Sequence, residues 1–96
     1  MEKIKVKAYS PKTSTQKITL SGACAKVLIK NFGDDDVYVG TTSDSTRTNG
    51  MIRIPPMTAQ YYEEKSLDSG RRQFISELYL LGDAASANTV EILEMG

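Results

Sequence analysis

The sequence predicts an all-β protein, a single antiparallel β-sandwich or jelly-roll-like domain of seven to eight short strands over residues 1–96. Three observations predict this class. Apolar and polar side chains alternate with a period of two through most of the chain, as they do on strands. Clusters of Gly, Pro, Asn and Asp interrupt the alternation at short intervals. No segment has the spacing of an amphipathic helix of ordinary length, so a helical connection between parallel strands is not expected.

Eight segments carry the alternation of a strand, and each is bounded by residues typical of turns. The expected strands cover residues 3–8, 16–20, 25–32, 37–39, 51–54, 59–64, 77–81 and 89–94. Within residues 65–76 the pattern is less clear, and its last four residues fit either a short strand or one helical turn.

The first two expected strands each have one apolar side. Ile4, Val6 and Ala8 alternate with lysines, which predicts one buried face and one solvated basic face. A Ser-Pro pair ends this strand, because proline has no N–H to give to a neighbouring strand. Ile18 and Leu20 are expected to face inward on the second strand, and a Ser-Gly pair to end it.

The next two strands predict a β-hairpin. Val27 and Ile29 share one face, and Leu28 lies between two lysines on the other face. Residues 31–36 read Asn-Phe-Gly-Asp-Asp-Asp, which is typical of a tight turn. Residues 37–39 form the returning strand, and a glycine ends it.

The later strands are separated by longer interruptions. Residues 41–50 form a polar loop without an apolar side chain. Pro55-Pro56 ends the following strand and forces a bend or a sheet edge. Residues 77–81 are apolar enough to lie centrally in a sheet, and in the closing strand Val90 and Ile92 share one face.

Charge is balanced in total but separated along the chain. Residues 1–30 hold seven lysines and one acidic residue, whereas residues 31–96 hold five basic and eleven acidic residues, so the net charges are +6 and −6. Three interpretations stay open. Basic and acidic strands lie side by side in the fold, or a basic segment meets nucleic acid or a membrane, or opposite faces let copies or a carrier protein meet.

Composition excludes several classes of protein. The chain has no His and no Trp, and its single Cys cannot form an internal disulfide. No apolar run is long enough for a transmembrane helix, and the alternating N-terminus does not resemble a signal peptide. Cys24 has no histidine to activate it, so we interpret it as a small buried hydrophobic residue.

The acidic clusters do not predict a catalytic or metal site. Asp34, Asp35 and Asp36 are consecutive on a turn, so their carboxylates cannot all converge on one cation. Glu63 and Glu64 are neighbours on a strand and point to opposite faces. We therefore expect no metal, no cofactor and no enzymatic activity.

Nucleic-acid and glycan binding are weakly indicated. Lys3, Lys5 and Lys7 form one basic stripe, which suits phosphate contacts. The sequence pI of about 6.2 opposes nucleic-acid binding. A glycan site prefers flat aromatic platforms, but there is no Trp, and Tyr61 and Tyr62 fall on two faces of their strand.

A longer string of strands and turns resembles a known group of proteins. Lys26–Gly40 runs from an apolar strand through Asn-Phe-Gly and an acidic turn to Val-Tyr-Val-Gly. Gly50–Pro55 adds an apolar strand that ends in proline. Glu77–Glu94 contains Leu-Tyr, a turn of small residues and a closing Val-Glu-Ile-Leu-Glu strand. Over residues 25–94 this order is similar to that of small structural proteins of tailed phages and prophages.

The resemblance implies a virion structural β-sandwich, either a capsid decoration or head-fibre protein or a part of the neck or tail. It transfers no active-site residues. The sequence departs from the pattern in the loop 41–50 and the insert 65–76, and residues 1–24 lie outside the similarity. The expected location is the virion, assembled in the host cytoplasm, without a membrane contact.

The expected partners are the major capsid protein or another virion protein, together with further copies of this chain. The basic side chains are the expected contact residues, because the first strand exposes lysines and arginine pairs well with carboxylates. These candidates are Lys3, Lys5, Lys7, Arg47, Arg71 and Arg72. An alternative interpretation is a glycan-binding or host-surface-binding module displayed on a virion.

Overall fold

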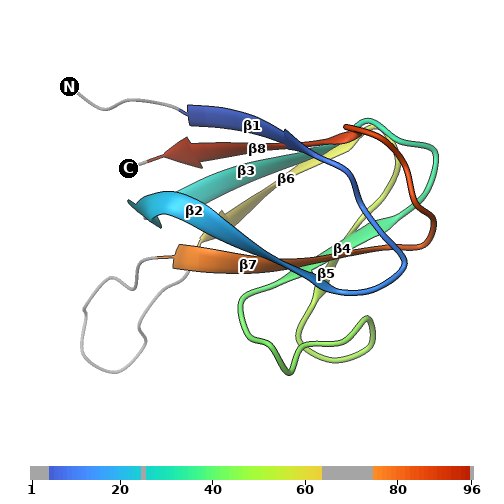
Figure 1. Cartoon of the computed structure of the whole chain (residues 1–96), viewed down its shortest axis with the longest axis horizontal. Helices are drawn as coiled ribbons and strands as arrows, with labels where there is room; N and C mark the ends of the chain where they lie inside the picture. Colours follow the sequence, from blue (N-terminus) through green and yellow to red (C-terminus); the bar gives the residue numbers. More distant parts are fainter. Residues whose placement is uncertain (1–4, 25, 64–74, 96) are drawn as a thin grey trace.

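In the computed structural model, eight β-strands form two antiparallel sheets of four strands each (Figure 1). The structure describes residues 5–24, 26–63 and 75–95. The strands are β1 Lys5–Tyr9, β2 Gln16–Cys24, β3 Lys26–Asn31, β4 Val37–Gly40, β5 Ile52–Ile54, β6 Thr58–Glu63, β7 Ile75–Gly82 and β8 Val90–Met95. The prediction of an all-β sandwich is confirmed.

Strand order identifies the connectivity as that of a jelly roll. The first sheet has the order β1-β8-β3-β6 and the second sheet has the order β2-β7-β4-β5. Strands therefore pair as a nested series, first with last and so on inward to β4 with β5. This is the pattern of a long β-hairpin, with β1 to β4 in one arm and β5 to β8 in the other, which is folded into two sheets.

Nested pairing also explains the separation of charge along the sequence. It brings the lysine-rich strands β1 to β3 against the acid-bearing strands of the C-terminal half. Lys17 on β2 meets Glu77 on β7, and Lys30 on β3 lies directly opposite Glu91 on β8. The interpretation that basic and acidic strands are neighbours in the fold is confirmed.

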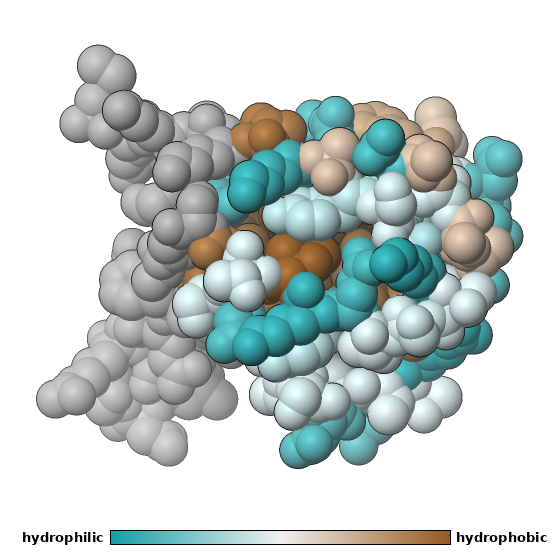
Figure 2. Space-filling view, viewed as in Figure 1, coloured by the Kyte–Doolittle hydropathy of each residue, from teal (hydrophilic) through white to brown (hydrophobic). Residues whose placement is uncertain are grey.

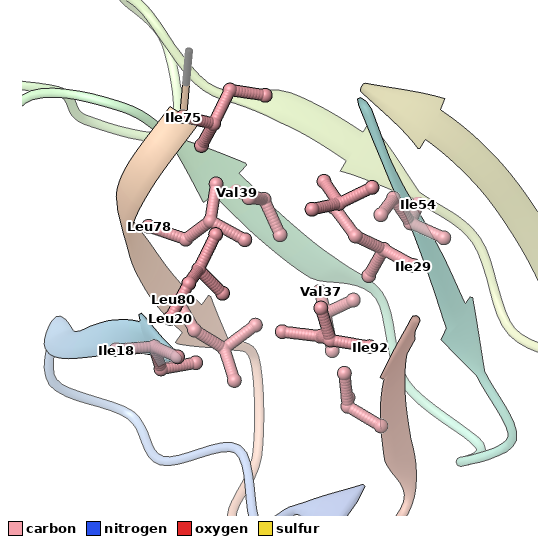
Figure 3. Close-up of a cluster of buried hydrophobic side chains, with 12 residues drawn as sticks. Ile18, Leu20, Ile29, Val37, Val39, Ile54, Ile75, Leu78, Leu80 and Ile92 are labelled. Carbon is pink, nitrogen blue, oxygen red and sulfur yellow. The ribbon is translucent and has the colours of Figure 1, made fainter. Parts of the chain in front are cut away.

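The core lies between the two sheets and is made from alternate residues of the strands. Figure 3 shows aliphatic side chains from both sheets pointing toward one another. The buried set contains Ile18, Leu20, Val27, Ile29, Val37, Val39, Ile54, Ile75, Leu78, Leu80, Val90 and Ile92. The predicted inward positions on the second, third and last strands are thus confirmed, and β7 is central in its sheet, as its apolar character predicts.

Polar residues cover most of the side seen in Figure 2. Apolar surface (brown) is seen in the centre of this view and at the left part of the upper edge, where Figure 1 places β1.

The predicted hairpin of β3 and β4 is wrong. β3 pairs with β6 and β8, whereas β4 pairs with β5 and β7, so residues 31–36 cross from one sheet to the other. The residue types that permit a tight turn also permit this crossover, because both connections need residues that tolerate tight or left-handed backbone conformations.

Asn31 holds the crossover in place. Its side chain is 1% exposed, and Nδ2 donates to the carbonyl oxygens of Asp35 at 2.8 Å and Ile54 at 3.0 Å. Its Oδ1 accepts the N–H of Gly33 at 3.0 Å. A residue of the first sheet is thus hydrogen-bonded to β5 of the second sheet. Both Nδ2 and Oδ1 of this buried amide form hydrogen bonds.

The predicted face of the first strand is also wrong. Val6 lies opposite Leu93 and is 54% exposed, whereas Lys7 lies opposite the buried Ile92. Directly opposite residues of an antiparallel pair share a face, so Val6 is on the outside and Lys7 is on the inner side of the sheet. β1 is an edge strand, where an inward-pointing lysine still reaches water, and edge strands commonly carry such charges.

The end of β2 differs from the prediction for a local reason, and the end of β5 agrees with it. β2 continues past the Ser-Gly pair to Cys24, because a register shift between Thr19 and Cys24 absorbs the irregularity. β5 ends at Ile54, directly before Pro55-Pro56, and lies at the edge of its sheet, as the proline pair predicts.

Candidate interaction surface

A row of apolar side chains crosses the outer face of the first sheet. Val6 lies opposite Leu93, Leu93 opposite Leu28, and Leu28 opposite Tyr61. On β3 the neighbours of Leu28 are both fully buried in the core, so Leu28 and the residues opposite it point away from the core. These four residues, one from each strand, are called the apolar row.

The apolar row is partly open to water. Val6 and Tyr61, at its two ends, are 54% and 52% exposed, and the two leucines between them are half-buried. Phe32, which directly follows β3, is 48% exposed, and Met57, which directly precedes β6, is 73% exposed. A row of apolar side chains open to water on one sheet face is typical of a protein contact surface.

Charged groups flank the apolar row. Lys26 places Nζ 4.5 Å from the ring centroid of Tyr61, so the ammonium covers one face of this aromatic ring. On the other side of the row, Lys30 and Glu91 lie opposite each other and are half-buried. The face therefore combines an apolar centre with charges of both signs, as protein contact surfaces often do.

The outer face of the second sheet has a different character, because its polar groups bind one another. Lys17 Nζ lies 3.0 Å from Glu77 Oε2, and Tyr79 donates its hydroxyl to the same oxygen at 3.3 Å. Arg53 Nη1 lies 3.8 Å from Asp36 Oδ2. Hydrogen bonding to Lys17 lowers the pKa of Glu77, and the same bond raises the pKa of Lys17.

The loop of residues 41–50 folds onto this second face. Arg47 Nη1 lies 2.7 Å from Asp83 Oδ1, and the guanidinium lies 5.3 Å from the ring centroid of Tyr38. Gly40 permits the close approach of the loop, because a Cβ there would lie 2.7 Å from Cβ of Ser45. The loop and the ion pairs make the outer face of the second sheet polar, and these charged groups are paired with one another within the chain.

Among the basic residues predicted to form an interface, the structure describes the side chains of Lys7 and Arg47. Lys3, Arg71 and Arg72 lie outside the described residues, and of Lys5 the structure describes only its place on β1. Lys7 is exposed on β1, but it lies on the inner side of this edge strand and not on the predicted outer basic face. The remaining candidate, Arg47, forms an ion pair with Asp83 within the chain, and its role at an interface stays a prediction.

Sequence reasoning missed the apolar row because its members are far apart in the chain. Leu28 was the available signal, since it is apolar on a face otherwise occupied by lysines. Leu28 is recognised as part of an apolar surface once strand pairing places Leu93 and Tyr61 beside it.

The acidic turn does not form a second site in the described part of the chain. Asp36 is close to Arg53, and among the described residues no group of three His, Cys, Asp or Glu side chains is placed to hold a metal ion. A recess beside Asn31 and Thr89 has room for about one water molecule. Thr89 Oγ1 is buried there without a hydrogen-bond partner in the structure.

Comparison with protein-family models, with curated proteins and with solved structures returns no match. In the part of the chain that the structure describes, no helix has the length and apolar character needed to cross a membrane.

The Lys17–Glu77 pair predicts a pH-dependent contribution to stability. Because the pKa of Glu77 is lowered from its ordinary 4.5, the pair stabilises the fold above that pH, and this contribution is lost as the pH falls below it. We expect Glu77→Gln to lower Tm at about pH 7 and to have no effect at about pH 2, as measured by circular dichroism. Asp44→Asn, in the exposed loop, is the control; a deficit of Glu77→Gln that persists at about pH 2 contradicts the assignment.

Proposed function

We propose that this chain is a non-enzymatic structural protein of a phage virion, which attaches to the capsid through its surface. Support for the virion assignment comes from the resemblance of residues 25–94 to small structural proteins of tailed phages. The fold is compatible with it, since jelly rolls build viral capsid domains as well as lectin domains. A fold alone does not decide function, so the function is inferred from the surface of the protein.

The observation that carries the proposal is the apolar row on an open sheet face. A 96-residue domain buries a limited fraction of its surface, so exposing Val6 and Tyr61 on one sheet face forgoes stabilisation that a contact would supply. In an assembled particle, neighbouring copies of a structural protein can cover such a row and recover this contribution. Many copies on a symmetric shell also turn weak single contacts into durable attachment.

The proposal is tested by sedimentation with capsids of the phage or prophage whose genome carries this gene. Purified heads that lack the protein are mixed with increasing amounts of it and pelleted. We expect saturable binding at a fixed ratio to the major capsid protein. Heads that already carry the protein are the control, because their sites are occupied.

Other outcomes assign the protein elsewhere. Binding to purified necks or tails with none to heads overturns capsid attachment. Binding to host cells or glycan arrays, with no binding to any particle, overturns the structural role in favour of the glycan or host-surface module. Tyr61, whose ring is partly covered by Lys26, is the residue to substitute in that case.

A further inference from the structure

We infer that the apolar row is the contact between two copies of this chain, which meet face to face about a two-fold axis that runs along the strands between β3 and β8. The inference rests on the proposed function only in that both treat the outer face of the first sheet as a contact surface. It is argued from the register of the strands, the charges beside the row and the size of the face.

The apolar residues match under this rotation. The axis exchanges β8 with β3 and β1 with β6, because the sheet order is β1-β8-β3-β6 and the axis passes through its middle. Leu93 of one copy then faces Leu28 of the second copy, and Val6 faces Tyr61. One such rotation therefore covers all four members of the row with apolar partners, as a self-complementary interface requires.

The charges distinguish this axis from the other one that the face permits. Glu91 and Lys30 lie directly opposite each other on β8 and β3, so rotation places Glu91 of each copy over Lys30 of the other. A two-fold axis along the apolar row itself would instead exchange the two sides of the row. Lys26 would then face Lys30 of the second copy, and like charges at an interface are unfavourable.

The second sheet limits the assembly to two copies. Its outer face is occupied by the Lys17–Glu77 pair and by the loop that Arg47 anchors to Asp83. It presents no comparable apolar row for a third copy among the described residues. When the first sheets of two copies face each other, both copies use the same surface and the dimer is closed. A contact between two different surfaces would instead allow further copies to add.

The area of the face predicts a weak, reversible dimer. Four strands about 4.8 Å apart, each contributing about six residues of about 3.3 Å, give a patch of about 20 Å by about 20 Å. Two such patches bury on the order of 800–1,000 Å², below the roughly 1,600 Å² of a typical stable complex. We therefore expect a dissociation constant of about 10 µM to about 1 mM.

The test is sedimentation velocity and light scattering of the full chain across about 1 µM to about 2 mM, which brackets the expected affinity. The average mass should rise from one chain toward two and should never exceed two. Leu28→Asn should weaken association at least about tenfold, because it places an amide at the centre of the apolar row. Thr19→Asn, at an exposed position on the outer face of the second sheet, should leave association unchanged.

A charge exchange tests the axis with variants that keep the apolar row. Lys30→Glu should weaken the dimer, because each Glu91 would face a glutamate of the other copy. The double variant Lys30→Glu with Glu91→Lys should restore association, since the pairs are then reversed. Circular dichroism confirms that each variant is folded.

Several results would overturn the inference. They are a monomer at every concentration, a trimer or larger assembly, equal association of Leu28→Asn and the native chain, or a double charge variant as weak as the single one. Capsid binding by a strictly monomeric protein would leave the proposed function intact and remove the dimer. A dimer that does not bind capsids would do the reverse.

Discussion

Asn31→Ala is expected to lower the free energy of unfolding by about 2–5 kcal/mol. The substitution leaves three backbone groups without their partner, namely the carbonyls of Asp35 and Ile54 and the N–H of Gly33. A buried polar group without a partner costs about 1–3 kcal/mol, and water reaches this 1% exposed position poorly. The whole fold is stable by about 5–15 kcal/mol, so the loss is a large fraction of it.

Urea unfolding followed by circular dichroism measures this effect. Asn49→Ala is the matched control, because Asn49 is exposed in the 41–50 loop and bonds to Thr46 through its backbone N–H and carbonyl oxygen. The control should change stability by less than about 0.5 kcal/mol. Equal effects of the two substitutions would show that Asn31 does not join the two sheets energetically.

Asn31 also illustrates where local sequence information ends. The turn chemistry of residues 31–36 was correctly identified, and the strands on either side of it were found. A turn between two paired strands and a crossover between two sheets use the same residue types, however, so the hairpin was wrong. The difference lies in the bond from Asn31 to Ile54, which joins residues 23 positions apart.

The faces of strands were predictable where a strand is central. Val27 and Ile29 on β3, and Val90 and Ile92 on β8, are buried because alternating apolar residues have a neighbour on each side. At the edge strand β1, the register with β8 decides the face, and Val6 points outward. A face set by pairing with a strand more than eighty residues away cannot be read from five local residues.

The same reason explains the candidate site. The basic residues were visible in the sequence as single charged positions, but Arg47 is used within the chain. The apolar row joins positions 6, 28, 61 and 93, which are brought together by nested pairing alone. The sequence pattern shows which residues are apolar, but it does not show which distant strands pair and in which register.

Two adjacent alanine substitutions on β3 should separate the roles of its two faces. Ile29→Ala removes a fully buried side chain from the core and is expected to cost about 2–5 kcal/mol in the free energy of unfolding. Leu28→Ala removes a side chain of similar size from the outer face, where it is half-buried, and is expected to cost less than about 1.5 kcal/mol. Urea unfolding at low protein concentration, where the chain is monomeric, measures both values.

The order of the two effects should reverse for self-association. Leu28→Ala should weaken the dimer about three- to tenfold while the fold is retained, because Leu28 faces Leu93 of the second copy. Ile29→Val keeps the core nearly filled, at a cost of about 0.5–1.5 kcal/mol, and should leave the dimer unchanged. If Leu28→Ala destabilised the monomer as strongly as Ile29→Ala, the outer face would already be covered within a single chain. The apolar row would then need no partner, and the physical basis for a contact surface on the first sheet would be lost.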